Sequence, residues 1–80
     1  MAKVLFFGIT KDLTKTSTEN IEIPNDKTSV SELKDILLQQ YPELSKVPDL
    51  MIAINTNYAK DDDVARSGDE IAIIPPTNGG

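Results

Sequence analysis

The chain of 80 residues contains no cysteine and no histidine. Without cysteine it cannot form a disulfide, a thiolate metal site or a cysteine nucleophile. Without histidine it lacks the commonest general base and the commonest metal ligand in proteins. A small domain without disulfides or a thiolate metal site is typical of the cytoplasm, and we expect the protein to be found there. The two absences argue against a self-contained enzyme.

Long apolar runs and an excess of positive charge are also missing. The densest apolar run, at residues 4–7, is too short for a signal peptide or a membrane span. Acidic residues outnumber basic ones by 13 to 8, which gives a formal net charge of −5. Because nucleic-acid phosphates require a positive field, we expect no nucleic-acid partner and no membrane contact. The charge favours a protein partner with a basic face.

The acidic residues do not have the spacing of a metal site. Asp61, Asp62 and Asp63 are contiguous, so their side chains diverge, whereas a calcium loop places its ligands at alternate positions. We interpret this run as a solvated loop or a helix start. Asp69 directly after Gly68 is typical of a turn. The sequence therefore predicts no metal bound by this chain.

One amphipathic helix is predicted over residues 29–41. Ser29 followed by Glu32 forms a capping box, in which the serine oxygen accepts a free backbone N–H and the glutamate reaches back. Pro42 ends the helix. The apolar residues recur at helical spacing and form one stripe, comprising Val30, Leu33, Ile36, Leu37 and Tyr41.

Short apolar segments on both sides of this helix predict strands. They cover residues 3–9, 19–23, 51–55 and 70–74, with a short extended piece at 58–59 and a loop of at most one helical turn at 10–18. The predicted order is two strands, one main helix that packs across a mixed sheet, and further strands. This order is that of an α+β fold of the β-grasp (ubiquitin-like) type. We expect one domain over residues 1–74.

The last six residues form a predicted flexible tail, because proline cannot donate to the sheet ladder and so ends the last strand. Fully extended, six residues reach about 20 Å, which is enough to enter a partner's cleft. Two terminal glycines would let the tail pass through a narrow channel. The tail consists of Pro75, Pro76, Thr77, Asn78, Gly79 and Gly80.

The α-carboxylate of Gly80 is the natural reactive group of this tail. At neutral pH it is an anion and a poor electrophile, so it needs activation, typically as an acyl-adenylate. The chain has no glycine-rich phosphate loop, so a separate enzyme would have to bring the ATP. The alternative interpretation is that the two glycines are a frayed end without a function.

Phe7, Tyr58 and Ile74 are candidates for a partner interface. Strand alternation does not place all three in one core. If some lie on the outer face of the sheet, they form an apolar patch near the exit of the tail. Alternatively, they are core residues or scattered surface residues.

Three segments carry a resemblance to a known family: KVLFFG at residues 3–8, the turn Gly68-Asp69-Glu70, and IIPPTNGG at residues 73–80. Together they resemble the small subunit of molybdopterin synthase, a family of ubiquitin-like sulfur carriers. The resemblance extends over the whole chain in length and in the order of its elements.

This resemblance implies that a MoeB-like adenylyltransferase, supplying ATP and Mg²⁺, adenylates Gly80, and that a sulfur donor enzyme then converts it to a thiocarboxylate. The tail would enter the large subunit of molybdopterin synthase, within a heterotetramer, and donate sulfur to a pyranopterin precursor of the molybdenum cofactor. The chain would bind no cofactor and would not be catalytic alone. Phe7, Tyr58 and Ile74 match interface positions of the family, although the family often has an aromatic residue at the position of Ile74.

Other functions remain open from the sequence. The chain could be a sulfur carrier of the thiamine or tRNA-thiolation type, or a protein modifier conjugated to lysines through Gly80. It could also be a passive interaction domain whose tail has no chemical role.

Overall fold

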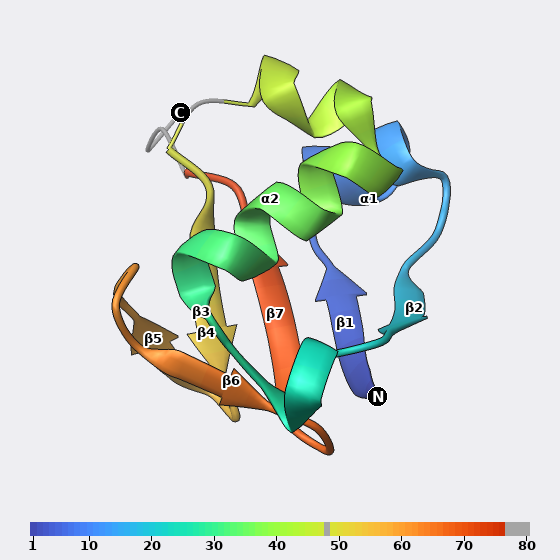
Figure 1. Ribbon diagram of the computed structural model, residues 1–80. Helices are drawn as coiled ribbons and strands as arrows, with labels where there is room; N and C mark the ends of the chain where they lie inside the picture. The colour runs from blue at the N-terminus through green and yellow to red at the C-terminus, as the bar shows by residue number, and fades with distance from the viewer. Residues whose placement is uncertain (48, 77–80) are drawn as a thin grey trace.

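The computed structural model describes residues 1–47 and 49–76. Over this range the chain forms two α-helices, two short 3₁₀ helices and seven strands (Figure 1). The helices are α1 (Ile9–Thr14), η1 (Pro24–Asp26), α2 (Val30–Gln40) and η2 (Pro42–Lys46). The strands are β1 (Ala2–Phe6), β2 (Thr18–Ile21), β3 (Lys27–Ser29), β4 (Met51–Ile54), β5 (Asn57–Ala59), β6 (Val64–Arg66) and β7 (Glu70–Ile74).

The main sheet has five strands in the order β2-β1-β7-β4-β5. Its two central strands, β1 and β7, run parallel, and the other pairs are antiparallel. Helix α2 crosses one face of this mixed sheet, as Figure 1 shows. The predicted α+β architecture of the β-grasp type is confirmed.

Helix α2 begins at a capping box, as the sequence predicts. The Ser29 hydroxyl oxygen accepts the Glu32 N–H at 3.1 Å. The Glu32 carboxylate in turn accepts the Ser29 hydroxyl at 3.2 Å, rather than the backbone N–H of the capping residue. Val30, Leu33 and Leu37 of the apolar stripe are buried.

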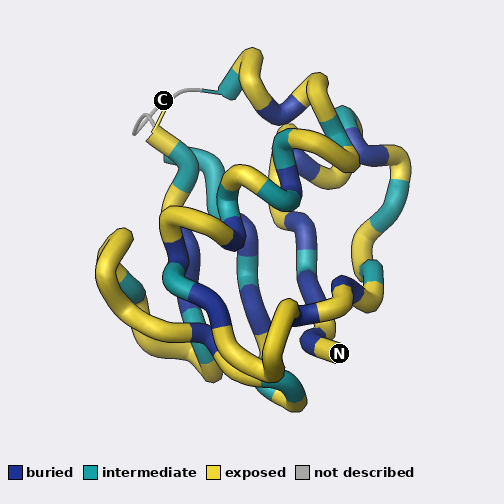
Figure 2. Tube along the Cα trace, viewed as in Figure 1, coloured by how far each residue is buried: buried dark blue, intermediate teal, exposed yellow. Residues whose placement is uncertain are grey.

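The core lies between α2 and the sheet. Figure 2 shows buried positions alternating along the central strands beneath the helix. Leu44 of η2 closes one end of this core at 1% exposure, although the sequence placed it in a plain connection. The sheet contributes Ala2, Val4, Phe6, Ile21, Ile52, Ile71 and Ile73 to the core.

The first strand is shorter than predicted. It ends at Phe6 instead of continuing to residue 9, because Gly8 adopts a positive φ of 57° and Ile9 starts α1. The predicted loop over residues 10–18 is therefore largely helical. Its buried residues are Thr10 and Thr14, and the Thr14 hydroxyl donates to the Thr10 carbonyl at 2.9 Å. Hydroxyls that bond to the backbone can be buried, which an apolar pattern does not reveal.

Other boundaries shift by one or two residues. Strand β2 begins at Thr18 and ends at Ile21, whereas residues 19–23 were predicted. Ile21 and Ile23 are nevertheless both buried, as alternation predicts. Strand β4 ends one residue early because Asn55 takes a positive φ of 50°.

A second sheet was not predicted. Strand β3 pairs antiparallel with β6 just before α2 begins. Beside this pair, the predicted acidic loop is an exposed turn. Its backbone carbonyls cap the helix: Asp63 accepts the Val30 N–H at 2.9 Å and Asp61 accepts the Ser31 N–H at 3.0 Å. The Asp61 carboxylate also pairs with Lys34 at 3.0 Å.

None of the described helices has the length and apolar character that crossing a lipid bilayer requires.

Candidate functional site

The base of the tail is held by the centre of the main sheet. Strand β7 lies between β1 and β4 and leads directly into Pro75 and Pro76, both of which are half-buried. The last strand ends at Ile74, where the two prolines begin, as predicted. The direction of the chain at this point is thus set by a strand with neighbours on both sides.

The remaining tail residues lie outside the described part of the chain. These are Thr77, Asn78, Gly79 and Gly80. Their role, and the flexibility expected of residues 75–80, stay predictions.

The two faces of β7 differ in what they contact. Ile71 and Ile73 point toward α2 and are fully buried. Ala72 and Ile74 therefore point to the opposite, outer face of the sheet. The pairing register places Leu5 and Ala53 on either side of Ala72.

The same register brings further apolar side chains onto the outer face. Met51 pairs with Ile74, and Tyr58 pairs with Ala53. Phe7 continues beyond β1, and its N–H donates to the Ile73 carbonyl at 3.2 Å, which places it next to Ile74. We call the following residues the outer-face patch: Leu5, Phe7, Met51, Tyr58 and Ile74.

The outer-face patch is accessible. Phe7 is 48% exposed, Met51 43% and Tyr58 68%, while Leu5 and Ile74 are half-buried. Exposed apolar side chains that gather on one face of a sheet are typical of protein interaction surfaces. The structure thus brings Phe7, Tyr58 and Ile74 to one face, the arrangement that the sequence left as one of its alternatives.

The sequence-based site omitted Leu5 and Met51. Alternation places Met51 opposite the buried Ile52, so a signal for its outward direction was present. What the sequence lacked was the pairing of Met51 with Ile74, which joins strands far apart in the chain.

The Gly68-Asp69-Glu70 turn lies at the start of β7, the opposite end of the strand from the tail. The Asp69 carboxylate accepts the Arg66 N–H at 2.8 Å and the Asn55 side-chain amide at 3.0 Å. The Asn55 side-chain oxygen accepts the Glu70 N–H at 3.0 Å. The interpretation of Asp69 as a turn residue is confirmed, and its bonds hold the turn in place.

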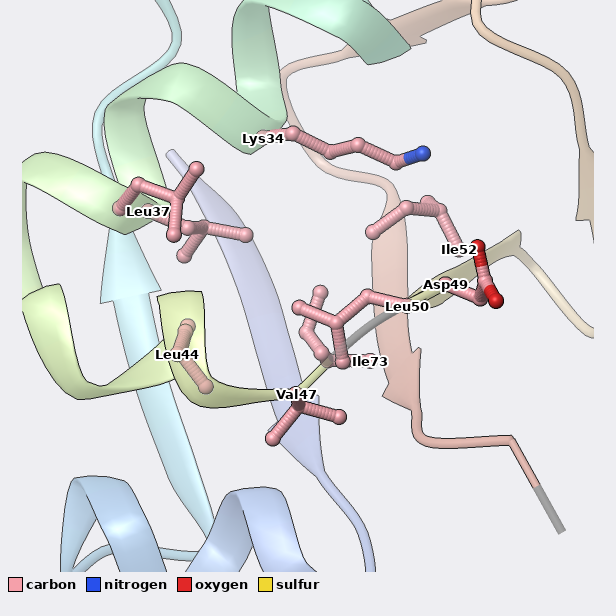
Figure 3. Close-up of a pocket in the computed structure, with 9 residues that line it drawn as sticks. Lys34, Leu37, Leu44, Val47, Asp49, Leu50, Ile52 and Ile73 are labelled. Atoms are coloured by element: carbon pink, nitrogen blue, oxygen red, sulfur yellow. The ribbon is translucent and has the colours of Figure 1, made fainter. Parts of the chain in front are cut away.

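An apolar cavity lies on the other face of the sheet, between α2, η2 and β4 (Figure 3). Its volume is about 310 Å³. Lys34 and Asp49 are the charged residues among those that line it, and Leu37, Leu50 and Ile52 belong to its apolar walls. Among the described residues, this lining offers no nucleophile paired with a base.

Tyr41 joins the end of α2 to the sheet. Its hydroxyl donates to the Glu19 carboxylate at 3.0 Å, and its ring packs edge-on against Phe6 with centroids 5.4 Å apart. Burial, followed by the hydrogen bond and the negative charge of Glu19, raises the pKa of Tyr41 above its usual range. Tyr41 lies apart from the outer-face patch, because its ring packs on Phe6, which faces the core.

The fold and the tail base define a ubiquitin-like β-grasp protein. Small archaeal modifier protein 1 of Haloferax volcanii has this fold, with a TM-score of 0.82 at 20% identity over 95% of this chain and 97% of its own. Subunits 1 and 2 of the molybdopterin-converting factor of Helicobacter pylori form a complex in a second structure. A chain of that complex matches with a TM-score of 0.67 at 27% identity, covering 99% of this chain and 97% of its own.

The chain belongs to the ThiS family, whose model matches residues 4–80. A Caenorhabditis briggsae relative is 41% identical over 81 residues, which cover 98% of this chain and 95% of the relative. An Arabidopsis thaliana relative is 33% identical over 79 residues, covering 98% and 81%. Both are named molybdopterin synthase sulfur carrier subunit, which confirms the family resemblance seen in the sequence.

Proposed function

We propose that this chain is a sulfur carrier that delivers sulfur from its C-terminal Gly80 as the small subunit of molybdopterin synthase. One observation carries the proposal: the similarity to sulfur carrier subunits covers nearly the whole chain, and the family match continues to residue 80. The central position of β7 gives the tail a firm base from which to reach a partner.

The chemistry begins at the Gly80 carboxylate. One carboxylate oxygen attacks the α-phosphorus of ATP and pyrophosphate leaves, which gives an acyl-adenylate. Hydrosulfide then attacks the carbonyl carbon, the bond to AMP breaks, and a proton is released, which leaves a thiocarboxylate. A MoeB-like adenylyltransferase supplies ATP and Mg²⁺, and a donor enzyme supplies the sulfur. In the large subunit, the thiocarboxylate sulfur bonds to a pyranopterin precursor in place of an oxygen leaving group. Water then hydrolyses the resulting thioester, which leaves the sulfur on the precursor and regenerates the Gly80 carboxylate.

The outer-face patch supplies the docking surface for both the adenylyltransferase and the large subunit in this proposal. Its exposed aromatic residues, Phe7 and Tyr58, are the type of side chain that dominates binding energy at interfaces. Ile74 directly precedes the tail, so a partner that covers the patch also receives the tail. The Helicobacter pylori complex of subunits 1 and 2 supports a partner of this kind.

The test is intact mass spectrometry of the chain after incubation with ATP, Mg²⁺, hydrosulfide and a MoeB-like enzyme. We expect a gain of about 16 Da, from exchange of one oxygen for sulfur. A variant lacking Gly80 should show no gain. No gain in the full chain, with the enzyme active on its own carrier, would overturn the proposal. Adducts to protein lysines in place of sulfur uptake would identify a modifier.

A further inference from the structure

The end of β1 turns into α1 at Gly8. Its φ of 57° and ψ of −134° fit the first central residue of a type II′ turn, a position that favours glycine. The Thr10 N–H donates to the Phe7 carbonyl at 3.1 Å across this turn. A residue with a side chain would adopt this backbone conformation only under strain.

The same glycine lies against the base of the tail. A Cβ atom placed on Gly8 would lie 3.0 Å from Cγ of Pro75 and 3.7 Å from its Cδ. The first distance is shorter than the 3.5–4.0 Å or so at which two carbon atoms pack comfortably. The Pro75 ring therefore occupies the space that a side chain at position 8 would need.

The contact between Gly8 and Pro75 lies just beyond the paired residues of β1 and β7. The Phe7 N–H donates to the Ile73 carbonyl, so the residue just before Gly8 is held to the residue two positions before Pro75. Proline has a fixed φ, and its ring cannot move independently of the backbone. Packing the ring on Gly8 thus restrains the backbone direction at the first residue of the tail.

We propose that Gly8 is a positioning residue for the tail: by lacking a side chain it lets the Pro75 ring pack on the β1–α1 turn, which sets the direction in which the tail leaves β7. This inference rests on the proposed function. A substitution that pushes the Pro75 ring off the turn would move the first residue of the tail relative to the outer-face patch. A displacement of even about 1 Å can slow a reaction up to roughly 100-fold.

The chain offers a matched control for each partner of the contact. Gly68 also has a positive φ, of 91°, but nothing lies within 4 Å of a Cβ placed there, and it lies before the start of β7. Gly68→Ala therefore introduces backbone strain without touching the tail. Pro24→Ala removes an exposed proline that lies outside the tail and keeps the Pro75 ring on Gly8.

The experiment measures kcat and KM for sulfur uptake at Gly80 in four variants. Pro75→Ala and Gly8→Ala should lower kcat about tenfold or more, with KM within about threefold because the outer-face patch is unchanged. Pro24→Ala and Gly68→Ala should stay within about twofold of the wild-type chain. The double variant Gly8→Ala/Pro75→Ala should be no slower than the slower single variant, since both changes break one contact.

Equal rates for Pro75→Ala and Pro24→Ala would overturn the inference and leave the sulfur carrier function standing. An equal loss in Gly68→Ala and Gly8→Ala would do the same, because general strain would then explain the effect. If Gly8→Ala does not fold, the comparison of Pro75→Ala with its control variant still tests the inference. A nuclear Overhauser effect between the Gly8 Hα and Pro75 ring protons should be present, and its absence would also overturn the inference. If the wild-type chain takes up no sulfur, the proposed function fails and the positioning role fails with it.

Discussion

Ile73 and Ile74 are adjacent in the chain but have different surroundings. Ile73 has no exposed surface and belongs to the core cluster, whereas Ile74 is half-buried on the outer face. The cause is the two-residue period of a strand, which sends neighbouring side chains to opposite faces of the sheet. Two side chains of equal size thus provide a direct comparison of core packing with interface contact.

Substituting each isoleucine by alanine should separate these two roles. Ile73→Ala should lower the free energy of unfolding by about 2–5 kcal/mol, because it leaves a cavity in the core. Ile74→Ala should cost only about 1 kcal/mol of stability but weaken binding to the large subunit about tenfold. Urea denaturation and titration calorimetry measure the two quantities. A loss of stability in Ile74→Ala as large as in Ile73→Ala would place Ile74 in the core, and unchanged affinity would remove it from the interface.

At the scale of elements, Tyr41 shows how α2 is tied to the sheet. Its N–H donates to the Leu37 carbonyl at 2.8 Å and closes the end of the helix. Its hydroxyl bonds to Glu19 of β2, and its ring packs on Phe6 of β1. One residue therefore connects three elements, and its titration reports on that connection.

The raised pKa of Tyr41 makes stability depend on pH in the alkaline range. Because the pKa is higher in the folded state, the unfolded state loses its proton first, so stability falls as the pH rises above about 10. Tyr41→Phe should be about 1 kcal/mol less stable near pH 8, where it lacks the hydrogen bond to Glu19. The difference between the two proteins should shrink above about pH 10, as measured by denaturation at each pH. Parallel curves for the two proteins would show that Tyr41 makes no contribution.

At the scale of the whole molecule, the proposed function gives the packed body and the tail separate tasks. Within the described residues, the core cluster extends from Ala2 to Ile73. The outer-face patch belongs to the body, whereas the proposed reactive carboxylate is at the chain end. Binding and chemistry can therefore be lost independently of each other.

A chain that lacks Gly79 and Gly80 should keep its thermal midpoint but acquire no sulfur. It should still dock through the outer-face patch and inhibit sulfur uptake by the full chain, with an inhibition constant within about tenfold of the KM. Calorimetry and the mass assay measure these effects, and the truncated Ile74→Ala variant serves as a control with weaker inhibition. Failure of the truncated chain to inhibit at roughly 100-fold excess would show that the body does not dock without its tail.

The features that the sequence predicted correctly depend on residues close together in the chain. The capping box at Ser29 and the helical spacing of Leu33 and Leu37 are local, so α2 could be placed almost to the residue. The end of β7 before Pro75 follows from the missing N–H of proline. The element order leading to a β-grasp fold rests on the same kind of local information. The chemistry at Gly80 was also inferred locally and stays a prediction.

The tertiary structure alone decided which distant residues meet. Pairing registers placed Met51 beside Ile74, joined β3 to β6, and brought Gly8 against Pro75. Each of these contacts spans more than twenty residues, and its partner is selected by packing of the whole core rather than by local propensity. The sequence alone therefore determined the main helix, the end of the last strand and the chemistry proposed for the chain end. Long-range packing determined the outer-face patch and the direction of the chain at Pro75.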